Sequence, residues 1–318
     1  MSQEPRPRPE LSAALVSFAA ADPGGWDHLF RAARLLDQAG FDRLVVSDHV
    51  VLGERLDEYG RPEIGGQRGG RQPTGPDGHW LEPLTTLSVL AGMTSRIRLG
   101  TNILIAALRR PAVLAKSTAT LDVLSGGRLD LGVGVGWQRE EYEAAGLAFE
   151  DRGRLLDHTL EVCQTLWRQT RASYTSPELR FENLHMMPKP LRAEGVPVWI
   201  SGTINPRVVR RLARFGTGWI PWGPDAADLP RAIPRMRAAL REAGRDPSGL
   251  QVVGRPPVHH HTDGTLDVPR TMAEVPPLLA AGVTDVRLAV GAPEDDSAAL
   301  DHLSAITAHF RATVRNHA

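Results

Sequence analysis

A histidine that follows a short apolar segment is the first candidate for proton chemistry. Ser47, Asp48 and His49 come directly after Leu44–Val46, which has the composition of a buried strand. An imidazole exchanges a proton near neutral pH, and a neighbouring carboxylate such as Asp48 can orient it. Adjacent residues of an extended strand point to opposite faces, so a loop histidine held by the backbone is the other interpretation. His49 is the candidate catalytic residue.

Alternating glycines mark a second candidate site. Gly132, Gly134 and Gly136 lie at the end of the apolar run Leu129–Val135, which follows the strand-like run Ile97–Ile105 and a helix. Two strands joined by a helix are parallel, and parallel sheets bind ligands at the carboxyl ends of their strands. Glycine lacks a Cβ and lets a flat ligand approach the backbone. The pattern matches a dinucleotide fingerprint only loosely, because no acidic residue closes a second strand at the expected distance.

A third candidate is an anion site at a strand-to-helix turn. Ser201, Gly202 and Thr203 precede Asn205 and Pro206, which are typical of the cap and first residue of a helix. Free backbone N–H groups at such a helix start can hold an anion, although a tight turn without a ligand explains the segment equally well. The phosphate-loop pattern is missing, which argues against nucleoside triphosphate chemistry.

Two further side-chain types attract a metal or redox interpretation without supporting it. His259, His260 and His261 are consecutive, so their side chains diverge, and no cysteine or carboxylate lies beside them at ligand spacing. No metal is therefore expected, and the role of the three histidines stays open. The single Cys163 lies among apolar helix positions and is expected to be a buried hydrophobic residue.

The elements that must position these residues follow an alternating strand–helix pattern. Eight short apolar segments, most of them separated by a plausible helix, predict an α/β fold of the (β/α)8 TIM-barrel type. A doubly wound open sheet is the alternative, but it does not need eight evenly spaced units. The predicted strands are Ala13–Phe18, Leu44–Val46, Ile97–Ile105, Leu129–Val135, Val196–Ile200, Gly218–Pro221, Gln251–Gly254 and Asp285–Val290.

Two segments interrupt this rhythm. Gly53–His79 is rich in glycine, proline and arginine and lacks apolar periodicity, so we expect a mobile insertion loop at the carboxyl-terminal mouth of the barrel. Arg171–Pro190 is expected to form a short hairpin outside the barrel. Neither segment is long enough to be a separate domain, and residues 1–318 are interpreted as a single barrel domain.

Composition narrows the class of protein. Hydrophobic residues make up 42% of the chain and charged residues 23%, and the 37 basic residues balance the 37 acidic ones. This charge balance favours neither a nucleic-acid nor an anionic membrane partner. The N-terminal sequence MSQEPRPRPE lacks an apolar signal region, and no apolar run reaches membrane-spanning length. We therefore expect a cytoplasmic enzyme.

Three segments together resemble the luciferase-like monooxygenase superfamily, and more narrowly its branch of coenzyme F420-dependent oxidoreductases. They are GFDRLVVSDHV at Gly40–Val50, the segment Thr94–Glu141, and VPVWISGTINPRVVRRLARFGTGWIP at Val196–Pro221. The resemblance implies a (β/α)8 barrel whose mouth holds the deazaflavin cofactor F420. It further implies hydride transfer between the deazaflavin and a small-molecule substrate, and a homodimer.

The resemblance also assigns site residues. His49 matches the histidine near the reactive face of the ring, and the peptide between Asn102 and Ile103 matches a non-proline cis bond behind it. The remaining cofactor-binding positions implied are Gly134, Val135 and Gly136 beside the ring, and Ser201, Gly202 and Thr203 at the cofactor's side chain and phosphate.

Other positions qualify the resemblance. The run Phe18-Ala19-Ala20 lacks the acidic residue of the family's sugar-phosphate dehydrogenases, and Trp137 stands near where they have another, which argues against sugar-phosphate oxidation. Asn102 stands where a smaller residue is usual and Thr217 replaces a common aspartate. Two alternatives therefore stay open, namely an FMN-dependent luciferase-like monooxygenase and a non-catalytic flavin-binding barrel subunit.

The cofactor's surroundings can also be anticipated. Trp137 and Trp222 are candidates for apolar walls. Arg207 or Arg210 is expected to contact the phosphate if either turns toward the mouth. Arginines within Arg55–Arg71 are candidates to meet the acidic tail that distinguishes F420 from FMN.

Overall fold

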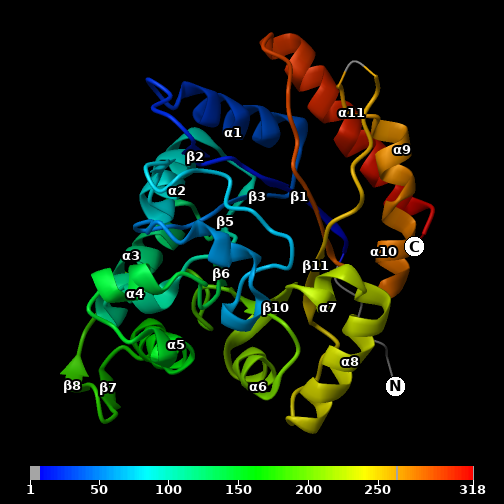
Figure 1. Ribbon diagram of the computed structural model, residues 1–318. Helices are drawn as coiled ribbons and strands as arrows, with labels where there is room; N and C mark the ends of the chain where they lie inside the picture. Colours follow the sequence, from blue (N-terminus) through cyan, green and yellow to red (C-terminus); the bar gives the residue numbers. More distant parts are fainter. Residues whose placement is uncertain (1–7, 263, 318) are drawn as a thin grey trace.

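Eight parallel strands close into a barrel in the computed structural model, which describes residues 8–262 and 264–317 (Figure 1). The order around the barrel is β1-β12-β11-β10-β9-β6-β5-β3, and β3 pairs with β1 again. This closure confirms the predicted (β/α)8 class and excludes the open sheet. The barrel strands are β1 (Glu10–Ala14), β3 (Arg43–Val46), β5 (Arg98–Thr101), β6 (Leu129–Val133), β9 (Val198–Gly202), β10 (Gly216–Pro221), β11 (Gln251–Gly254) and β12 (Asp285–Leu288).

Each barrel strand overlaps its predicted segment, but several bounds differ. For example, β5 ends at Thr101 and β6 at Val133, before the predicted ends at Ile105 and Val135. The first strand was expected at Ala13–Phe18, but β1 already ends at Ala14. Phe18 instead starts a separate short strand, because its ring stacks on Trp80 with the ring centroids 4.2 Å apart. The resulting antiparallel pair consists of β2 (Phe18–Ala19) and β4 (His79–Trp80).

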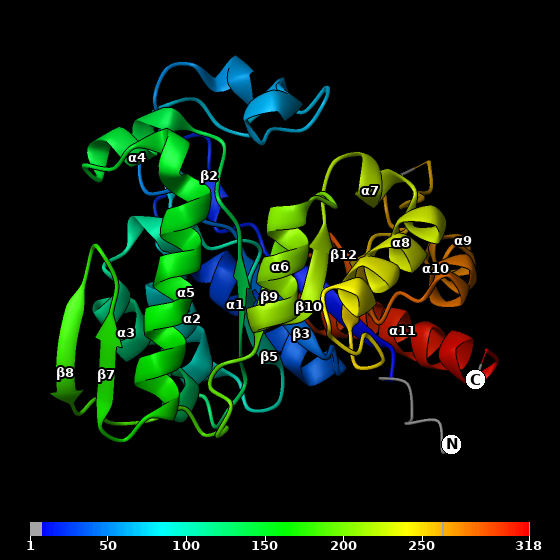
Figure 2. The ribbon, with the colours of Figure 1, turned by 90° about the horizontal axis from the view of Figure 1, so that it is seen from below.

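Helices surround the barrel, as the two ribbon views show (Figures 1 and 2). The start of α3 illustrates the local rules, because Pro111 occupies its first position, where no N–H is needed. Its end is closed by Gly127, whose N–H donates to the Asp122 carbonyl at 2.8 Å. The helices are α1 (Asp27–Ala39), α2 (Pro83–Met93), α3 (Pro111–Leu124), α4 (Arg139–Ala144), α5 (Arg152–Arg168), α6 (Pro206–Phe215), α7 (Pro224–Ala227), α8 (Leu229–Glu242), α9 (Val268–Ala273), α10 (Val275–Ala281) and α11 (Asp296–Arg315). None of the helices in the described residues is long and apolar enough to cross a bilayer.

The predicted hairpin outside the barrel is confirmed. Strands β7 (Ala172–Thr175) and β8 (Arg180–Leu184) pair in antiparallel register beyond α5. Tyr174 stacks on Phe181 across the pair, with ring centroids 5.9 Å apart.

A buried ion network ties the strands together inside the barrel. Arg43 of β3 donates from Nε to Asp130 Oδ2 of β6 at 2.8 Å and from Nη1 to Asp285 of β12. Arg98 pairs with the same Asp130 at 2.6 Å, and Arg287 pairs with Asp285 at 3.1 Å. Burial acts to raise the pKa of Asp130 and Asp285, but the adjacent arginines hold both pKa values below their ordinary range. The network therefore joins strands that are not sheet neighbours.

The insertion Gly53–His79 lies over one end of the barrel. It contains two 3-10 turns, η1 (Leu56–Gly60) and η2 (Pro62–Ile64), visible as the light-blue segment at the top of Figure 2. Two further 3-10 turns, η3 (Ala106–Leu108) and η4 (Phe149–Asp151), precede α3 and α5. The insertion reaches the barrel mouth, as expected, with more local structure than the sequence indicates.

Candidate active site at the barrel mouth

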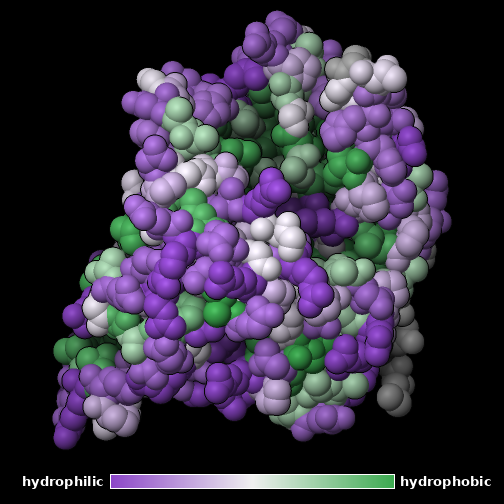
Figure 3. Space-filling view, in the orientation of Figure 1, coloured by the Kyte–Doolittle hydropathy of each residue, from purple (hydrophilic) through white to green (hydrophobic). Residues whose placement is uncertain are grey.

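A cavity of about 460 Å³ lies between the carboxyl ends of the barrel strands and the insertion loop. Its size is that of a small-molecule site. Figure 3 looks onto this end of the molecule and shows a recess with hydrophobic residues at its base between hydrophilic flanks. The cavity is lined by the candidate catalytic residue and by all the cofactor-binding residues that the family resemblance implies, namely His49, Asn102, Ile103, Gly134, Val135, Gly136, Ser201, Gly202 and Thr203.

The ends of β5 and β6 form one wall of the cavity. The peptide between Asn102 and Ile103 is cis, as predicted. A Cβ added at Gly134 would lie 3.0 Å from the Ile103 side chain, and one at Gly136 would lie 3.1 Å from Ile105. Gly136 also has a φ of 66°, which favours glycine. Both glycines are thus required for the shape of this wall.

Asn102 is held by the buried ion network. Its Oδ1 accepts a hydrogen bond from Nη1 of Arg287 at 2.9 Å. Asn102 therefore extends the buried ion network from Arg287 of β12 toward the barrel mouth. Ile103, the next residue, lies on the cavity wall.

His49 faces a carboxylate that the sequence analysis did not select. Its Nδ1 lies 3.3 Å from Oε1 of Glu141 in α4, and the Glu141 side chain is fully buried. The same Oε1 accepts a hydrogen bond from the Val50 N–H at 2.8 Å, which fixes the carboxylate. Trp80 packs edge-on against the imidazole at 4.6 Å. The ring is thus held from two sides.

Asp48 does not orient His49, contrary to one interpretation of the sequence. Its Oδ2 accepts from the Ile105 N–H at 2.8 Å, and its Oδ1 accepts from Nη2 of Arg109 at 2.9 Å. The physical reason is the alternation of an extended chain, which sends adjacent side chains in opposite directions. Asp48 braces the turn after β5 instead.

The end of β9 differs in part from the expected anion site. Asn205 caps α6 as predicted, and its Oδ1 accepts from the N–H groups of Arg207 at 3.0 Å and Val208 at 3.1 Å. Those two N–H groups are therefore already satisfied. The free donors at this turn are the hydroxyls of Ser201 and Thr203, which make no hydrogen bond to another described residue.

The arginine that lines the cavity near this turn is not one of the two expected from the sequence. Among the described residues, neither Arg207 nor Arg210 lines the cavity, whereas Arg211 does. Arg211 is committed to α5, because its Nε donates to Asp157 at 2.6 Å and its Nη2 donates to the Gly153 carbonyl at 2.9 Å.

Aromatic side chains and the insertion loop cover the cavity. Tyr59 of η1 contacts Trp137 and Trp222, with ring centroids 5.3 and 6.5 Å apart. Trp222 also donates from Nε1 to the Gly66 carbonyl at 3.2 Å, which attaches the loop to the end of β10. Both tryptophans were expected as apolar walls, and both line the cavity.

Arg255 is a cavity residue that the sequence analysis missed. It follows β11 directly and lines the cavity. The available signal is its position, because polar residues at the carboxyl ends of barrel strands face the catalytic mouth. The three histidines that follow it do not line the cavity: His259 contacts Glu274 at 3.0 Å and His261 lies 4.0 Å from Asp267. Over the described ranges, no group of three ligand-type residues is placed to hold a metal.

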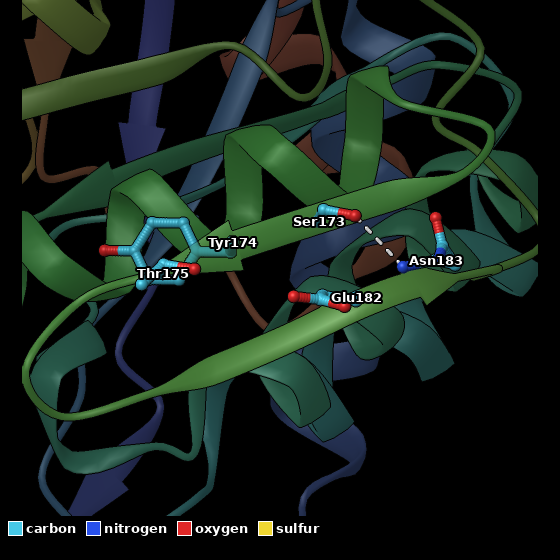
Figure 4. A pocket seen from close by; sticks show the side chains of 5 residues that line it. All are labelled: Ser173, Tyr174, Thr175, Glu182 and Asn183. Carbon is cyan, nitrogen blue, oxygen red and sulfur yellow. Dashed lines mark hydrogen bonds between the residues drawn. The ribbon is translucent and has the colours of Figure 1, made fainter.

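A second hollow lies on the β7–β8 hairpin (Figure 4). It is open and polar, and the Ser173 hydroxyl accepts a hydrogen bond from the Asn183 N–H at 3.0 Å across it. Glu182 is the one ionisable carboxylate among its lining residues, so the hollow offers no comparable set of chemical groups.

Two proteins of Mycobacterium tuberculosis are similar to this chain in sequence. An uncharacterised protein of Mycobacterium tuberculosis is 31% identical over 218 residues, which are 68% of this chain and 74% of that protein. A phthiodiolone/phenolphthiodiolone dimycocerosates ketoreductase of the same species is 35% identical over 173 residues, which are 53% of this chain but 45% of the ketoreductase.

Solved structures share the fold at low sequence identity. A monooxygenase from Streptomyces bottropensis matches with a TM-score of 0.73 and 18% identity, over 95% of this chain and 99% of that one. An F420-dependent secondary alcohol dehydrogenase with an F420-acetone adduct matches at 0.72 and 17%, over 96% and 99%. The oxygenating constituent of 3,6-diketocamphane monooxygenase from Pseudomonas putida, in complex with FMN, matches at 0.70 and 13%, over 95% and 98%.

The family model of the luciferase-like monooxygenases matches residues 11–267. The match begins in β1 and extends past β11, so it includes every strand end that contributes a candidate residue to the cavity. The chain belongs to the luciferase-like monooxygenase family.

Proposed function

We propose that this protein is a coenzyme F420-dependent oxidoreductase that moves a hydride between the deazaflavin and a small organic substrate. The observation that carries the proposal is His49, whose imidazole borders an enclosed cavity with a buried carboxylate behind Nδ1. Interconversion of a carbonyl and an alcohol needs a hydride carrier and a group that gives or takes a proton. A ketoreductase and an alcohol dehydrogenase among the similar proteins are named for reactions of this kind.

The cavity fits a flat ring with a polar edge. Gly134 leaves open the space beside Ile103, and Gly136 the space beside Ile105, that side chains would fill. Ser47 Oγ and Gln72 Nε2 line the same cavity and are buried without a hydrogen-bond partner. Buried polar groups of this kind normally have a partner, which the edge of a deazaflavin or flavin ring supplies.

Under this proposal, the residues carried over from the family hold the cofactor. Asn102–Ile103 and Gly134–Gly136 support the ring, and Ser201–Thr203 bind the phosphate through the two free hydroxyls. The bound deazaflavin supplies a two-electron hydride, which is the difficult part of the chemistry.

The chain itself supplies proton handling and exclusion of water. Glu141 faces Nδ1 of His49 at 3.3 Å, and Nε2 is the atom that exchanges a proton with the substrate oxygen. Tyr59, Trp137 and Trp222 cover the cavity and keep bulk water from the reacting groups.

Titration of the purified protein with F420 and FMN in parallel tests the choice of cofactor. We expect F420 to bind more tightly, because Arg68 and Arg71 of the insertion are exposed, have no salt bridge to a described residue and are available to its acidic tail. The preference should weaken as salt rises, since exposed charge contacts are screened. Equal affinity, or tighter FMN binding, would support the FMN-dependent monooxygenase that the FMN-bound structural neighbour favours. Absence of binding to both would support a non-catalytic subunit.

We also propose that the protein is a homodimer that associates through α2 and α3. Val89 on α2 and Val113 and Leu124 on α3 are 45%, 63% and 71% exposed, although the two helices pack side by side. A second copy would cover these apolar side chains. Sedimentation velocity should give a dimer that Val113→Glu dissociates, and a monomeric wild type would refute this.

A further inference from the structure

Arg255 is the cavity arginine without a counter-ion. Among the described residues it makes no salt bridge and no side-chain hydrogen bond, although its guanidinium lies at the end of β11 beside the cavity. The other arginine that lines the cavity, Arg211, is paired with Asp157. Asp285 attracts Arg255 electrostatically, but its salt bridges are formed with Arg43 and Arg287.

The carboxylates nearest the cavity face groups other than Arg255. Asp48 is neutralised by Arg109, and Glu141 faces His49. Arg255 therefore adds one positive charge that forms no salt bridge with a carboxylate among the described residues. A guanidinium left in this way is normally found where an anionic ligand binds.

The side chain of Arg255 is exposed to solvent at the cavity. It lines the cavity, and burial by surrounding groups lowers the pKa of the guanidinium. Tyr59 of the insertion interacts with it electrostatically, and burial raises the pKa of the Tyr59 phenol, so the phenol keeps its proton. Tyr59 thus provides a neutral O–H donor near the guanidinium.

The barrel topology separates Arg255 from the residues proposed to hold the cofactor. Those residues follow β5, β6 and β9, which are neighbours on one side of the barrel. His49 follows β3 and Arg255 follows β11, and the strands between them on the other side are β1 and β12. A substrate that lies over the ends of β1 and β12 can contact the His49 imidazole at one end and the Arg255 guanidinium at the other.

We propose that Arg255, assisted by Tyr59, binds a carboxylate of the substrate, so that the enzyme acts on small organic acids. The reacting carbonyl or hydroxyl group then lies toward His49. A planar carboxylate matches the two-pronged donor geometry of one guanidinium, whereas a phosphate dianion usually gathers several cationic or N–H donors. The reaction rests on the proposed function, but binding of the carboxylate is testable without it.

Binding of benzoate, its neutral analogue benzamide, and phenyl phosphate to the purified protein at pH 7 tests this site. Calorimetric titration, with and without saturating F420, gives the affinities. We expect the wild type to bind benzoate more tightly than benzamide, and Arg255→Gln to weaken benzoate by about 10- to 100-fold, which is the loss expected for a charge-assisted hydrogen-bonded pair. Benzamide affinity should stay unchanged, and Tyr59→Phe should produce a smaller loss for benzoate alone.

Matched variants separate charge from folding. Arg34 is exposed on α1 and distant in the fold from the barrel mouth, so Arg34→Gln controls for a change in net charge. Arg255→Lys keeps the positive charge but lacks the planar guanidinium, so it should retain part of the preference for benzoate. Thermal denaturation should show that each variant is folded.

Three results would overturn the proposal. The first is equal wild-type affinity for benzoate and benzamide, and the second is a benzoate preference that survives in Arg255→Gln. The third is an Arg255→Gln variant that loses affinity for F420 or phenyl phosphate but not for benzoate, which would assign the guanidinium to a phosphate. A protein that binds benzoate through Arg255 but neither F420 nor FMN would refute the proposed function and leave this site intact.

Discussion

Nδ1 of His49 lies 3.3 Å from Oε1 of Glu141, a carboxylate that the structure buries completely. The contact joins the end of β3 to α4, and the Val50 N–H holds the carboxylate in place from the other direction. One nitrogen of the imidazole therefore faces a buried carboxylate, and the other is available to a ligand.

Replacing His49 tests its role in proton transfer. His49→Ala should lower kcat by about two to four powers of ten, because the proton that accompanies hydride transfer loses its carrier. F420 affinity, measured by fluorescence titration, should change little. His309→Ala, an exposed position on α11, is the matched control. Wild-type turnover in His49→Ala would remove this residue from the mechanism.

Glu141→Gln tests whether the carboxylate positions the imidazole. The amide keeps an acceptor for the Val50 N–H but lacks the charge that faces Nδ1. We expect kcat to fall about tenfold while KM and F420 affinity stay near wild type, since oriented proton transfer contributes on the order of 10²–10⁴ in rate. A purely structural role would instead lower the melting temperature and affect KM and kcat together. That outcome would show that Glu141 does not act by positioning the His49 imidazole.

Gly134→Ala tests the cavity wall. The added Cβ would lie 3.0 Å from Ile103, so the isoleucine must move or the methyl group must enter the space proposed for the ring. We expect F420 affinity to fall about tenfold, because overpacking of this kind costs roughly 1–3 kcal/mol. The double variant Gly134→Ala with Ile103→Val should recover part of the affinity. Unchanged F420 binding in the single variant would place the ring elsewhere.

Asp130→Asn tests the buried ion network. The variant leaves Arg43 and Arg98 without the carboxylate they share, and breaking a buried pair in this way costs about 3–5 kcal/mol. Urea denaturation measures the change in the free energy of unfolding. Arg34→Gln, an exposed substitution on α1, should change it by well under 1 kcal/mol.

The same network predicts how stability depends on pH. The pKa of Asp130 and that of Asp285 lie below the ordinary value of 3.8 in the folded protein. Their stabilising contribution is therefore complete above about pH 4 and is lost as pH falls through the lower folded-state pKa values. Melting temperatures recorded between pH 7 and pH 3 should decline more steeply below pH 4 in the wild type than in Asp130→Asn. Parallel curves for the two proteins would contradict this.

The features that the sequence predicts correctly depend on local patterns. The alternation of apolar strands with helices identifies the barrel, and the glycine spacing at Gly134 and Gly136 identifies the wall, because backbone shape and burial follow from neighbouring residues. The error at Phe18 has the opposite origin, since the aromatic stack with Trp80 joins segments far apart in the chain. An apolar residue next to a strand does not reveal such a partner.

The site residues that could not be predicted from the sequence also depend on contacts between segments far apart in the chain. Tyr59 reaches the cavity through the insertion loop and Glu141 reaches His49 through α4, and no local periodicity specifies either arrangement. Asp48 is adjacent to His49 in sequence but belongs to Arg109 in space. Arg255 could have been selected by the rule that polar residues end barrel strands at the mouth, and the neighbouring histidines are the more conspicuous signal.

The ion network inside the barrel also has a consequence for where the chain can be divided. The family match ends at residue 267, yet Asp285, which neutralises Arg43 near the beginning of the chain, lies beyond it in β12. A fragment that stops at the end of the match would lose one barrel strand and would also remove one of the three carboxylates that pair with the buried Arg43. The last fifty residues are therefore not an appendage to a self-sufficient core, because the N-terminal strands depend on their charge.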